Sequence, residues 1–362
     1  MTQASAAAVS AAISASARTA RSPSRGPFAA LDLGTNNCRL LIARRAGHQG
    51  ERVLASDDFL VVDAYSRIVR LGEGLLQSGR LSDAAMDRAL VALGACAEKL
   101  ARRGVSQVRS VATEACRRAE NGPLFVKRVY EETGLALDVI TPAEEARLAV
   151  LGCQTLIDMK SRRTLVFDIG GGSTEIVLIE RRNFNQHRNR PQRNSHAMKG
   201  WVSVPWGVVS LAETELLDAG TPTARLEAYG RMKARVSSHF GALRADLARS
   251  AGTDVQLLGA SGTVTTLASL NMGLAQYDRK KVDGSLACTT ELRALSHDLA
   301  VRSPEDRARI PGIGPDRADL VVAGCAILEA LLDLSPAPQL RVADRGIREG
   351  ILRSMMARDG AV

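Results

Sequence analysis

One short pattern occurs twice in this chain of 362 residues, and it limits the folds that the chain can adopt. Each copy is an apolar run, an Asp-x-Gly turn and a second apolar run, over residues 28–43 and residues 164–179. Apolar runs on either side of a glycine turn are typical of β-hairpins. Because one hairpin opens each half of the chain, the repeat predicts a duplicated core.

The segments around the two hairpins alternate between strand-like and helix-like patterns. We expect further strands over residues 51–60, 105–112, 137–140, 201–204 and 255–259. We expect helices near residues 82–104, 123–133, 225–250 and 316–334, the first with Ser82 as its N-cap. Strands alternating with helices predict an α/β fold class.

The length suits two domains of roughly 100–200 residues each. We place a disordered tail at residues 1–27, a first domain at 28–143 and a second at 144–343. The last segment, 344–362, is expected to form a helix that packs back on the first domain.

The net charge of +9 comes from two segments. Residues 1–27 carry three arginines and no acid, and residues 181–200 carry six basic residues and no acid, which leaves 39 basic and 39 acidic residues elsewhere. The stretch 181–200 is expected to be a solvated hairpin loop, and capture of long polyanions is the alternative. Because the body is neutral and aromatics make up only 3%, we expect no nucleic-acid partner.

The six cysteines are scattered, without CxxC pairs or metal-finger spacing. We therefore expect reduced, buried thiols and a cytoplasmic location. No apolar run approaches the ~18 residues that a membrane span needs, and the Ala/Ser-rich start is a poor secretory signal. We expect no membrane partner.

The two turns have the composition of phosphate-binding loops. Glycine allows backbone N–H groups to approach an anion, and a neighbouring Asp can hold Mg²⁺ against the same phosphate. One such turn could equally be a plain structural hairpin. Two of them, placed face to face, would bind a phosphate from both sides. The turns are Asp32-Leu33-Gly34-Thr35-Asn36-Asn37 and Asp168-Ile169-Gly170-Gly171-Gly172-Ser173-Thr174-Glu175.

At this point the chain resembles a known family. The blocks are ALDLGTNNCRLLIA, VATEACRRAEN, TPAEEARL, LVFDIGGGSTEIVLI, SVPWGVVSLAE, LLGASGTVTTLASL, PGIGPDRADLVVAGCAILEALL and DRGIREGIL. In this order they resemble the exopolyphosphatase/guanosine pentaphosphate phosphohydrolase (Ppx/GppA) family of the actin-like ATPase superfamily. The resemblance implies two ribonuclease H-like domains with an active-site cleft between them. It also implies a short form without the C-terminal helical domain of longer members.

The resemblance implies roles for individual residues. Glu145 would be the general base, with helix capping as the alternative for both Glu144 and Glu145. Mg²⁺, or Mn²⁺ in its place, would be held by Asp32, Asp168 and Glu175. The predicted phosphate contacts are Gly34, Thr35, Asn36, Asn37, Arg39, Arg117, Gly170, Gly171, Gly172, Ser173, Gly259, Ser261 and Gly262.

The chain departs from the family pattern near these positions. Asn37 stands where Ser is common, Trp206 replaces a smaller apolar residue, and Pro142 and Ala143 precede Glu144 in place of Gly-Glu. Glu114 and Arg118 are unusual neighbours of Arg117.

The resemblance implies an Mg²⁺-dependent exopolyphosphatase that removes terminal phosphate from inorganic polyphosphate. The first alternative is a guanosine pentaphosphate 5′-phosphohydrolase. A sugar-kinase-like phosphotransferase and a non-enzymatic, nucleotide-switched actin-like scaffold are more distant alternatives. A homodimer is a common state for soluble enzymes, and we keep it as an expectation.

Overall fold

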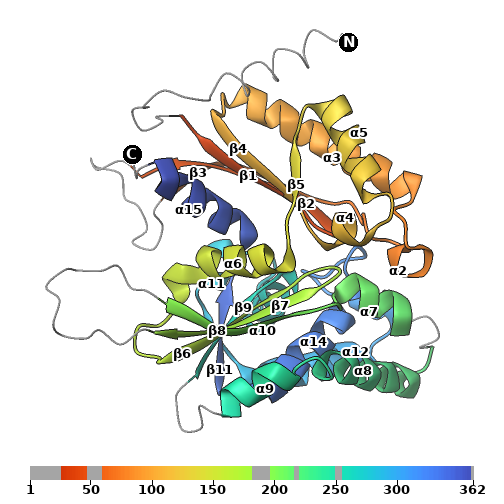
Figure 1. The fold of residues 1–362 in the computed structure, drawn as a ribbon. Helices are drawn as coiled ribbons and strands as arrows, with labels where there is room; N and C mark the ends of the chain where they lie inside the picture. Colours follow the sequence, from red (N-terminus) through yellow and green to blue (C-terminus); the bar gives the residue numbers. More distant parts are fainter. Residues whose placement is uncertain (1–25, 47–58, 182–195, 216–219, 249–254, 360–362) are drawn as a thin grey trace, which may run out of the picture. The chain divides into compact units, whose positions relative to one another are not determined.

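The computed structural model describes residues 26–46, 59–181, 196–215, 220–248 and 255–359. The chain divides into two compact units (Figure 1). Unit 1 comprises the chain up to Thr155 together with Ile347–Val362, and unit 2 comprises Leu156–Gly346.

Unit 1 is built on a five-stranded sheet in the order β3-β2-β1-β4-β5. Strand β1 pairs antiparallel with β2 and parallel with β4, while β2 pairs antiparallel with β3 and β4 parallel with β5. The strands are β1 Phe28–Leu33, β2 Asn37–Arg45, β3 Phe59–Ile68, β4 Gln107–Ala112 and β5 Leu137–Val139.

Helices cover both faces of this sheet. Strand β1 contributes side chains to the core on each face, because successive side chains of a strand point to opposite faces. Ala29, Leu31 and Leu33 join the core that includes residues of α3 and α5, whereas Phe28 and Ala30 join the core that includes residues of α6 and α15. Figure 1 shows α3 and α5 on one side of the sheet and α15 on the other. The helices are α2 Leu75–Ser78, α3 Asp83–Arg102, α4 Glu114–Arg118, α5 Gly122–Thr133, α6 Pro142–Cys153 and α15 Ile347–Asp359.

Unit 2 is built on a six-stranded sheet in the order β10-β11-β9-β6-β7-β8. Strands β6, β9 and β11 are parallel, and the pairs β6–β7, β7–β8 and β10–β11 are antiparallel. The strands are β6 Arg163–Ile169, β7 Thr174–Arg181, β8 His196–Val204, β9 Val255–Ala260, β10 Leu286–Cys288 and β11 Gln339–Ala343.

One large core joins this second sheet to its helices. Leu165, Phe167 and Ile169 of β6 point into it, and the apolar helix α14 crosses its centre with most of its side chains buried. The helical segments of this unit are η1 Gln154–Leu156, which begins in unit 1, and α7 Val208–Glu215, α8 Pro222–Ser237, α9 Gly241–Ala248, α10 Gly262–Asn271, α11 Arg279–Val282, α12 Thr289–Val301, α13 Pro304–Ala308 and α14 Leu320–Leu334.

The two sheets repeat one plan. The order β8-β7-β6-β9-β11 reproduces β3-β2-β1-β4-β5 with the same strand directions, and β10 is an addition at the edge. The predicted α/β class and the duplication are confirmed. The predicted helix after Ser82 is also confirmed, because the Ser82 hydroxyl accepts the Ala85 N–H at 3.2 Å and caps α3.

Four expectations differ from the structure or lie beyond it. The described third strand is β3 at Phe59–Ile68, later than the predicted 51–60, of which 51–58 lie outside the described residues. The region 225–250 forms two helices, α8 and α9, because the chain turns at residues 238–240. Helix α6 belongs to unit 1, so the division falls after residue 155 and not after 143. Most of the tail 1–27 and residues 182–195 of the basic stretch lie outside the described residues, while its two ends belong to the paired strands β7 and β8.

Candidate functional site

The parallel strands of unit 1 place three chemically important segments at one edge of the sheet. Leu33 of β1 lies beside Ala112 of β4, and Ala112 lies beside Val139 of β5, so all three strands end together. The loop 34–36 follows β1, helix α4 follows β4, and helix α6 follows β5. The carboxyl edge of an open α/β sheet is where such folds bind ligands.

The first glycine turn is held by hydrogen bonds that fix the direction of its peptide groups. The Gly34 N–H donates to the Asn37 carbonyl at 2.9 Å and closes the turn. The carbonyls of Thr35 and Asn36 accept N–H groups from residues 69–72 at 2.8–3.1 Å. In a trans peptide the N–H points opposite to the carbonyl. The N–H groups of Asn36 and Asn37 therefore point away from residues 69–72.

The second turn uses the same device with a different partner. The Gly170 N–H donates to the Ser173 carbonyl at 3.0 Å, as Gly34 does to Asn37. The carbonyls of Gly170 and Gly171 accept N–H groups from the start of α7, from Val208 at 3.0 Å and Val209 at 2.8 Å respectively. By the same peptide geometry, the N–H groups of Gly171 and Gly172 point away from α7. Both turns thus present backbone donors in fixed directions, as an anion site requires.

Each turn is packed against a glycine that sequence reasoning did not assign to the site. A Cβ added at Gly207 would lie 2.4 Å from the Gly171 carbonyl carbon and 2.6 Å from the Gly170 oxygen. A Cβ added at Gly72 would lie 2.3 Å from the Thr35 methyl group. The sequence signal is a glycine that follows the third strand of each hairpin unit by a few residues. This glycine can be recognised as part of the site only when the two units are compared as repeats.

Asp32 is a carboxylate whose hydrogen bonding is incomplete among the described residues. It faces Arg39 across the β1–β2 pair, and its Oδ1 is buried with no hydrogen-bond partner among the described residues. Burial raises the pKa of Asp32, and the nearby Arg39 and Arg348 partly offset this. An orphaned buried carboxylate oxygen is costly without a cation or donor. The structure therefore supports a cation or donor at this position.

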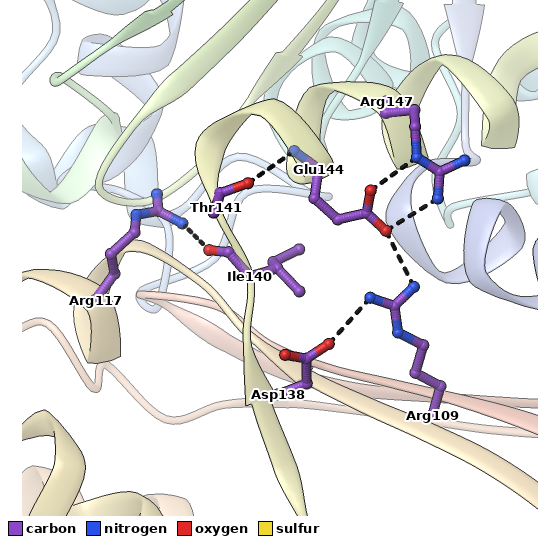
Figure 2. Close-up of polar contacts among 7 residues, drawn as sticks. All are labelled: Arg109, Arg117, Asp138, Ile140, Thr141, Glu144 and Arg147. Carbon is purple, nitrogen blue, oxygen red and sulfur yellow. Dashed lines mark hydrogen bonds and ion pairs between the residues drawn. The ribbon is translucent and has the colours of Figure 1, made fainter.

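The two adjacent glutamates of α6 have different surroundings. Thr141 caps the helix through a 3.2 Å bond from the Glu144 N–H. Glu144 pairs with Arg109 at 3.1 Å and Arg147 at 2.7 Å, as Figure 2 shows. The hydrogen bonds from Arg147, then Arg109, lower its pKa to about 2. Glu144 is thus occupied in structural ion pairs.

Glu145 turns the other way and is 6% exposed. Its Oε2 accepts a hydrogen bond from Arg117 Nη1 at 3.2 Å. The same Nη1 donates to the Ile140 carbonyl at 2.7 Å, which is visible in Figure 2. The structure therefore brings Glu145 and Arg117 together at the edge that also carries the loop 34–36. Arg117 is engaged with carboxylates here, and its assignment to phosphate binding stays a prediction.

In unit 2, Asp168 and Glu175 are direct cross-strand partners in β6 and β7. Their side chains share the face opposite to the helical core, since Phe167 and Ile176 point into that core. Glu175 is 2% exposed and its Oε1 accepts the Ser203 hydroxyl at 2.9 Å. A Cβ at Gly346 would lie 3.6 Å from Asp168 Oδ2, so this chain segment passes close to the carboxylate.

The donor chemistry fits Mg²⁺. Asp32, Asp168 and Glu175 offer oxygen ligands only, the kind that Mg²⁺ and Mn²⁺ prefer, and Asp32 has the orphaned oxygen. Within the described ranges, however, no group of three or more His, Cys, Asp or Glu residues is close enough to form a complete metal site by itself. Metal binding by Asp32, Asp168 and Glu175 stays a prediction.

The third predicted loop is only partly suited to ligand contact. Gly259 lies inside β9 between β6 and β11, and a Cβ there would lie 2.7 Å from the Phe167 ring. Close packing against Phe167 therefore explains why this position is a glycine. Ser261 caps α10 by accepting the Val264 N–H at 3.0 Å, and Gly262 begins that helix at the carboxyl end of β9. Phosphate binding by these three residues stays a prediction.

The predicted burial of the thiols is confirmed for five of the six cysteines. All six are free, and only Cys288 is partly exposed. Cys38 and Cys96 lie with their sulfur atoms 4.0 Å apart in the core of unit 1. Among the described residues, no helix combines the length and the apolar character needed to cross a membrane.

The repeated sheet plan, with a glycine turn after the first strand of each copy, defines the duplicated α/β fold of the actin-like ATPases. Among solved structures, the chain resembles an exopolyphosphatase from Cytophaga hutchinsonii, with a TM-score of 0.76 and 25% identity over 92% of this chain and 98% of that one. It also resembles the Aquifex aeolicus member of the Ppx/GppA family, with a TM-score of 0.69 and 28% identity over 92% and 98% of the two chains.

Sequence comparison identifies the family. The model of the Ppx/GppA phosphatase family matches residues 49–359. Exopolyphosphatase 2 of Mycobacterium tuberculosis is 31% identical over 338 residues, which cover 90% of this chain and 98% of that protein. The chain belongs to the Ppx/GppA phosphatase family, and it is a hydrolase of phosphoanhydride bonds.

Proposed function

We propose that this protein is an exopolyphosphatase that removes terminal phosphate from inorganic polyphosphate, with Glu145 as the general base. One observation carries the proposal. A buried glutamate lies at the start of α6, at the same sheet edge as a turn whose N–H groups are fixed in direction. The neighbouring Glu144 is already engaged with two arginines and is not available for this role.

The reaction needs a base, an attacking water and groups that stabilise negative charge. Glu145 accepts a proton from the water while the water oxygen forms a bond to the terminal phosphorus. The bond between that phosphorus and the bridging oxygen breaks, and the shortened polyphosphate leaves with the electron pair. The N–H groups of the turns 34–37 and 170–173 hold phosphate oxygens and stabilise the charge that spreads over them.

The carboxylates Asp32, Asp168 and Glu175 are proposed to hold Mg²⁺, which when bound would neutralise charge on the phosphate oxygens. Arg39, which lies beside Asp32 on the same face of the sheet, is proposed to contact phosphate. It is well suited to this because its planar fork can bind two phosphate oxygens. The free, mostly buried thiols support a cytoplasmic location.

The substrate is proposed from the named relatives. Exopolyphosphatase 2 of M. tuberculosis aligns over nearly its full length, and the C. hutchinsonii exopolyphosphatase has the same fold. Guanosine pentaphosphate hydrolysis, the other activity that the family resemblance implies, is the second candidate. Both reactions use the same chemistry at the phosphoanhydride bond, so substrate competition can separate them.

The test is phosphate release from a panel of polyphosphates of different length and from guanosine pentaphosphate, with Mg²⁺ present. We expect a higher kcat/KM for polyphosphate. Glu145→Gln should lower kcat by roughly 10²–10⁴ and leave KM largely unchanged. Glu144→Gln is the matched control, because it removes the same charge one residue away, and it should retain activity. A Glu145→Gln variant as active as the Glu144→Gln variant would remove Glu145 from the role of base.

A further inference from the structure

The guanidinium of Arg117 is surrounded by acceptors from its own unit. Its Nε and Nη2 both donate to Glu114 Oε2, at 3.1 and 2.6 Å. Its Nη1 donates to the Ile140 carbonyl at 2.7 Å and to Glu145 Oε2 at 3.2 Å. The side chains of Arg117, Glu114 and Glu145 are 19%, 17% and 8% exposed, so water competes little for these contacts.

These contacts use most of what an arginine can offer. A guanidinium has five N–H donors, and its strong binding of phosphate depends on two parallel N–H groups. In Arg117, the edge formed by Nε and Nη2 is occupied by Glu114, and Nη1 is shared between Ile140 and Glu145. Two parallel donors are therefore not left for a substrate phosphate.

Arg117 instead connects the parts that place Glu145. It lies on α4, which follows β4, and its N–H donates to the Thr113 carbonyl at 3.1 Å. Ile140 precedes the N-cap of α6, and Glu145 lies in the first turn of that helix. One guanidinium thus contacts both the backbone before α6 and the carboxylate within it. Glu114, three residues before Arg117 on α4, fixes the opposite edge of the guanidinium.

We propose that Arg117 is a positioning residue for Glu145, and that Glu114 acts on the reaction only through Arg117. This inference rests on the proposed role of Glu145 as the base. It gives Arg117 a role other than the phosphate contact expected from the family resemblance. It also gives a function to Glu114, one of the unusual residues in this chain.

Charge makes the two substitutions distinguishable. Arg117→Gln removes the cation beside Glu145 and should shift the acidic limb of the kcat/KM pH profile to higher pH. Glu114→Gln removes a like charge and leaves Arg117 with one carboxylate partner, so the same limb should shift to lower pH. Charged groups on or against α6 in the described part of the chain include Glu144 with its two arginines, Asp138 beside Arg109, and Arg348, Glu349 and Arg353 on the packed helix α15. They are unchanged in both variants.

The kinetic constants provide the second readout. Loss of a hydrogen-bond partner that orients a metal-binding residue typically costs roughly 10- to 100-fold in affinity or activity. By the same reasoning, Arg117→Gln should lower kcat by roughly that factor, with KM within about twofold. Glu120→Gln is the matched control, because Glu120 is an exposed glutamate of the same segment that pairs only with Arg80 among the described contacts. It should leave kcat and the pH profile unchanged.

A double variant tests whether Glu114 acts through Arg117. In the Arg117→Gln background, Glu114→Gln should change kcat by less than about twofold, because the residue it anchors is gone. Equal effects of Glu114→Gln in both backgrounds would overturn the inference. A shift of both pH profiles in the same direction would also overturn it.

Binding separates this inference from the proposed function. Polyphosphate affinity is measured by equilibrium binding in the Glu145→Gln background, with and without Arg117→Gln, so no turnover is needed. We expect the same Kd for both. A tenfold weaker Kd with Arg117→Gln would make Arg117 a phosphate ligand and overturn the inference. If the wild-type protein releases no phosphate from any substrate of the panel, the proposed function fails, and that result is independent of this Kd comparison.

Discussion

The contact between Gly207 and the second glycine turn gives the sharpest test of how the site is built. In Gly207→Ala, the new Cβ would lie 2.4 Å from the Gly171 carbonyl carbon and 2.5 Å from its oxygen. Ordinary contacts of a Cβ begin near 3.4 Å. The neighbours are backbone atoms and cannot rotate away, so the turn and the start of α7 must separate by about 1 Å, on the scale of shifts that alter catalysis.

This separation has a cost in stability and in activity. Overpacking typically costs about 1–3 kcal/mol, and loss of the Val209 hydrogen bond to Gly171 would add about 1 kcal/mol. For a unit of this size, each kcal/mol lowers the melting temperature by roughly 2–4 °C. Because we propose that this turn binds phosphate, displacing it by about 1 Å should lower kcat/KM roughly 10²-fold.

The assay is thermal unfolding followed by circular dichroism, together with phosphate release. The matched control is Gly230→Ala on the exposed face of α8, where an added Cβ meets nothing within 4 Å. Replacing a mid-helix glycine by alanine should stabilise the protein by about 0.5–1 kcal/mol. If Gly207→Ala unfolds at the wild-type temperature and keeps its kcat/KM within twofold, the packing argument is wrong.

Three further predictions concern single residues. Gly72→Ala should have a smaller effect on stability than Gly207→Ala, because its added Cβ meets the rotatable Thr35 side chain and not backbone; equal melting temperatures would contradict this. Asp32→Asn should abolish activity and raise the melting temperature at pH 7, because burial raises the pKa of Asp32 and penalises its charged form in the folded protein. This gain in melting temperature should vanish below about pH 3.8, where Asp32 is protonated in both the folded and the unfolded protein. Glu144→Gln should lower stability at neutral pH, and the loss should fade as pH falls from about 4.5 towards 2, because the Glu144 pKa is about 2; unfolding temperatures measured across this range test the sign.

Local sequence patterns were sufficient for the elements that carry the site. The apolar runs on both sides of Asp32 and Asp168 predicted two hairpins, and a hairpin of fixed length sets its register, which places Asp168 opposite Glu175. Ser82 predicted the start of α3 because its hydroxyl satisfies an unpaired N–H of the first turn. The continuation of β3 over residues 61–68 was not predicted, because an edge strand with exposed polar residues lacks a clear apolar alternation.

Contacts between distant segments could not be read in this way. The pairing of Arg117 with Glu145 joins residues 28 positions apart, and it exists because parallel strands bring the ends of β4 and β5 to the same edge. The packing of Gly207 on Gly171 depends on how β8 and α7 return to the turn. The sequence around one residue of such a pair does not predict its partner, because the fold of the intervening chain, which brings the two together, depends on other contacts.

The sequence by itself determined the repeat, the two glycine turns and the acidic residues beside them, since each depends on neighbours within a few positions. Tertiary structure decided which of two adjacent glutamates is buried. Glu144 and Glu145 have the same chemistry, yet the helix rotates successive side chains by about 100° and turns one to Arg109 and Arg147 and the other to Arg117. The packing of α6 against its neighbours therefore determines which of the two glutamates is buried.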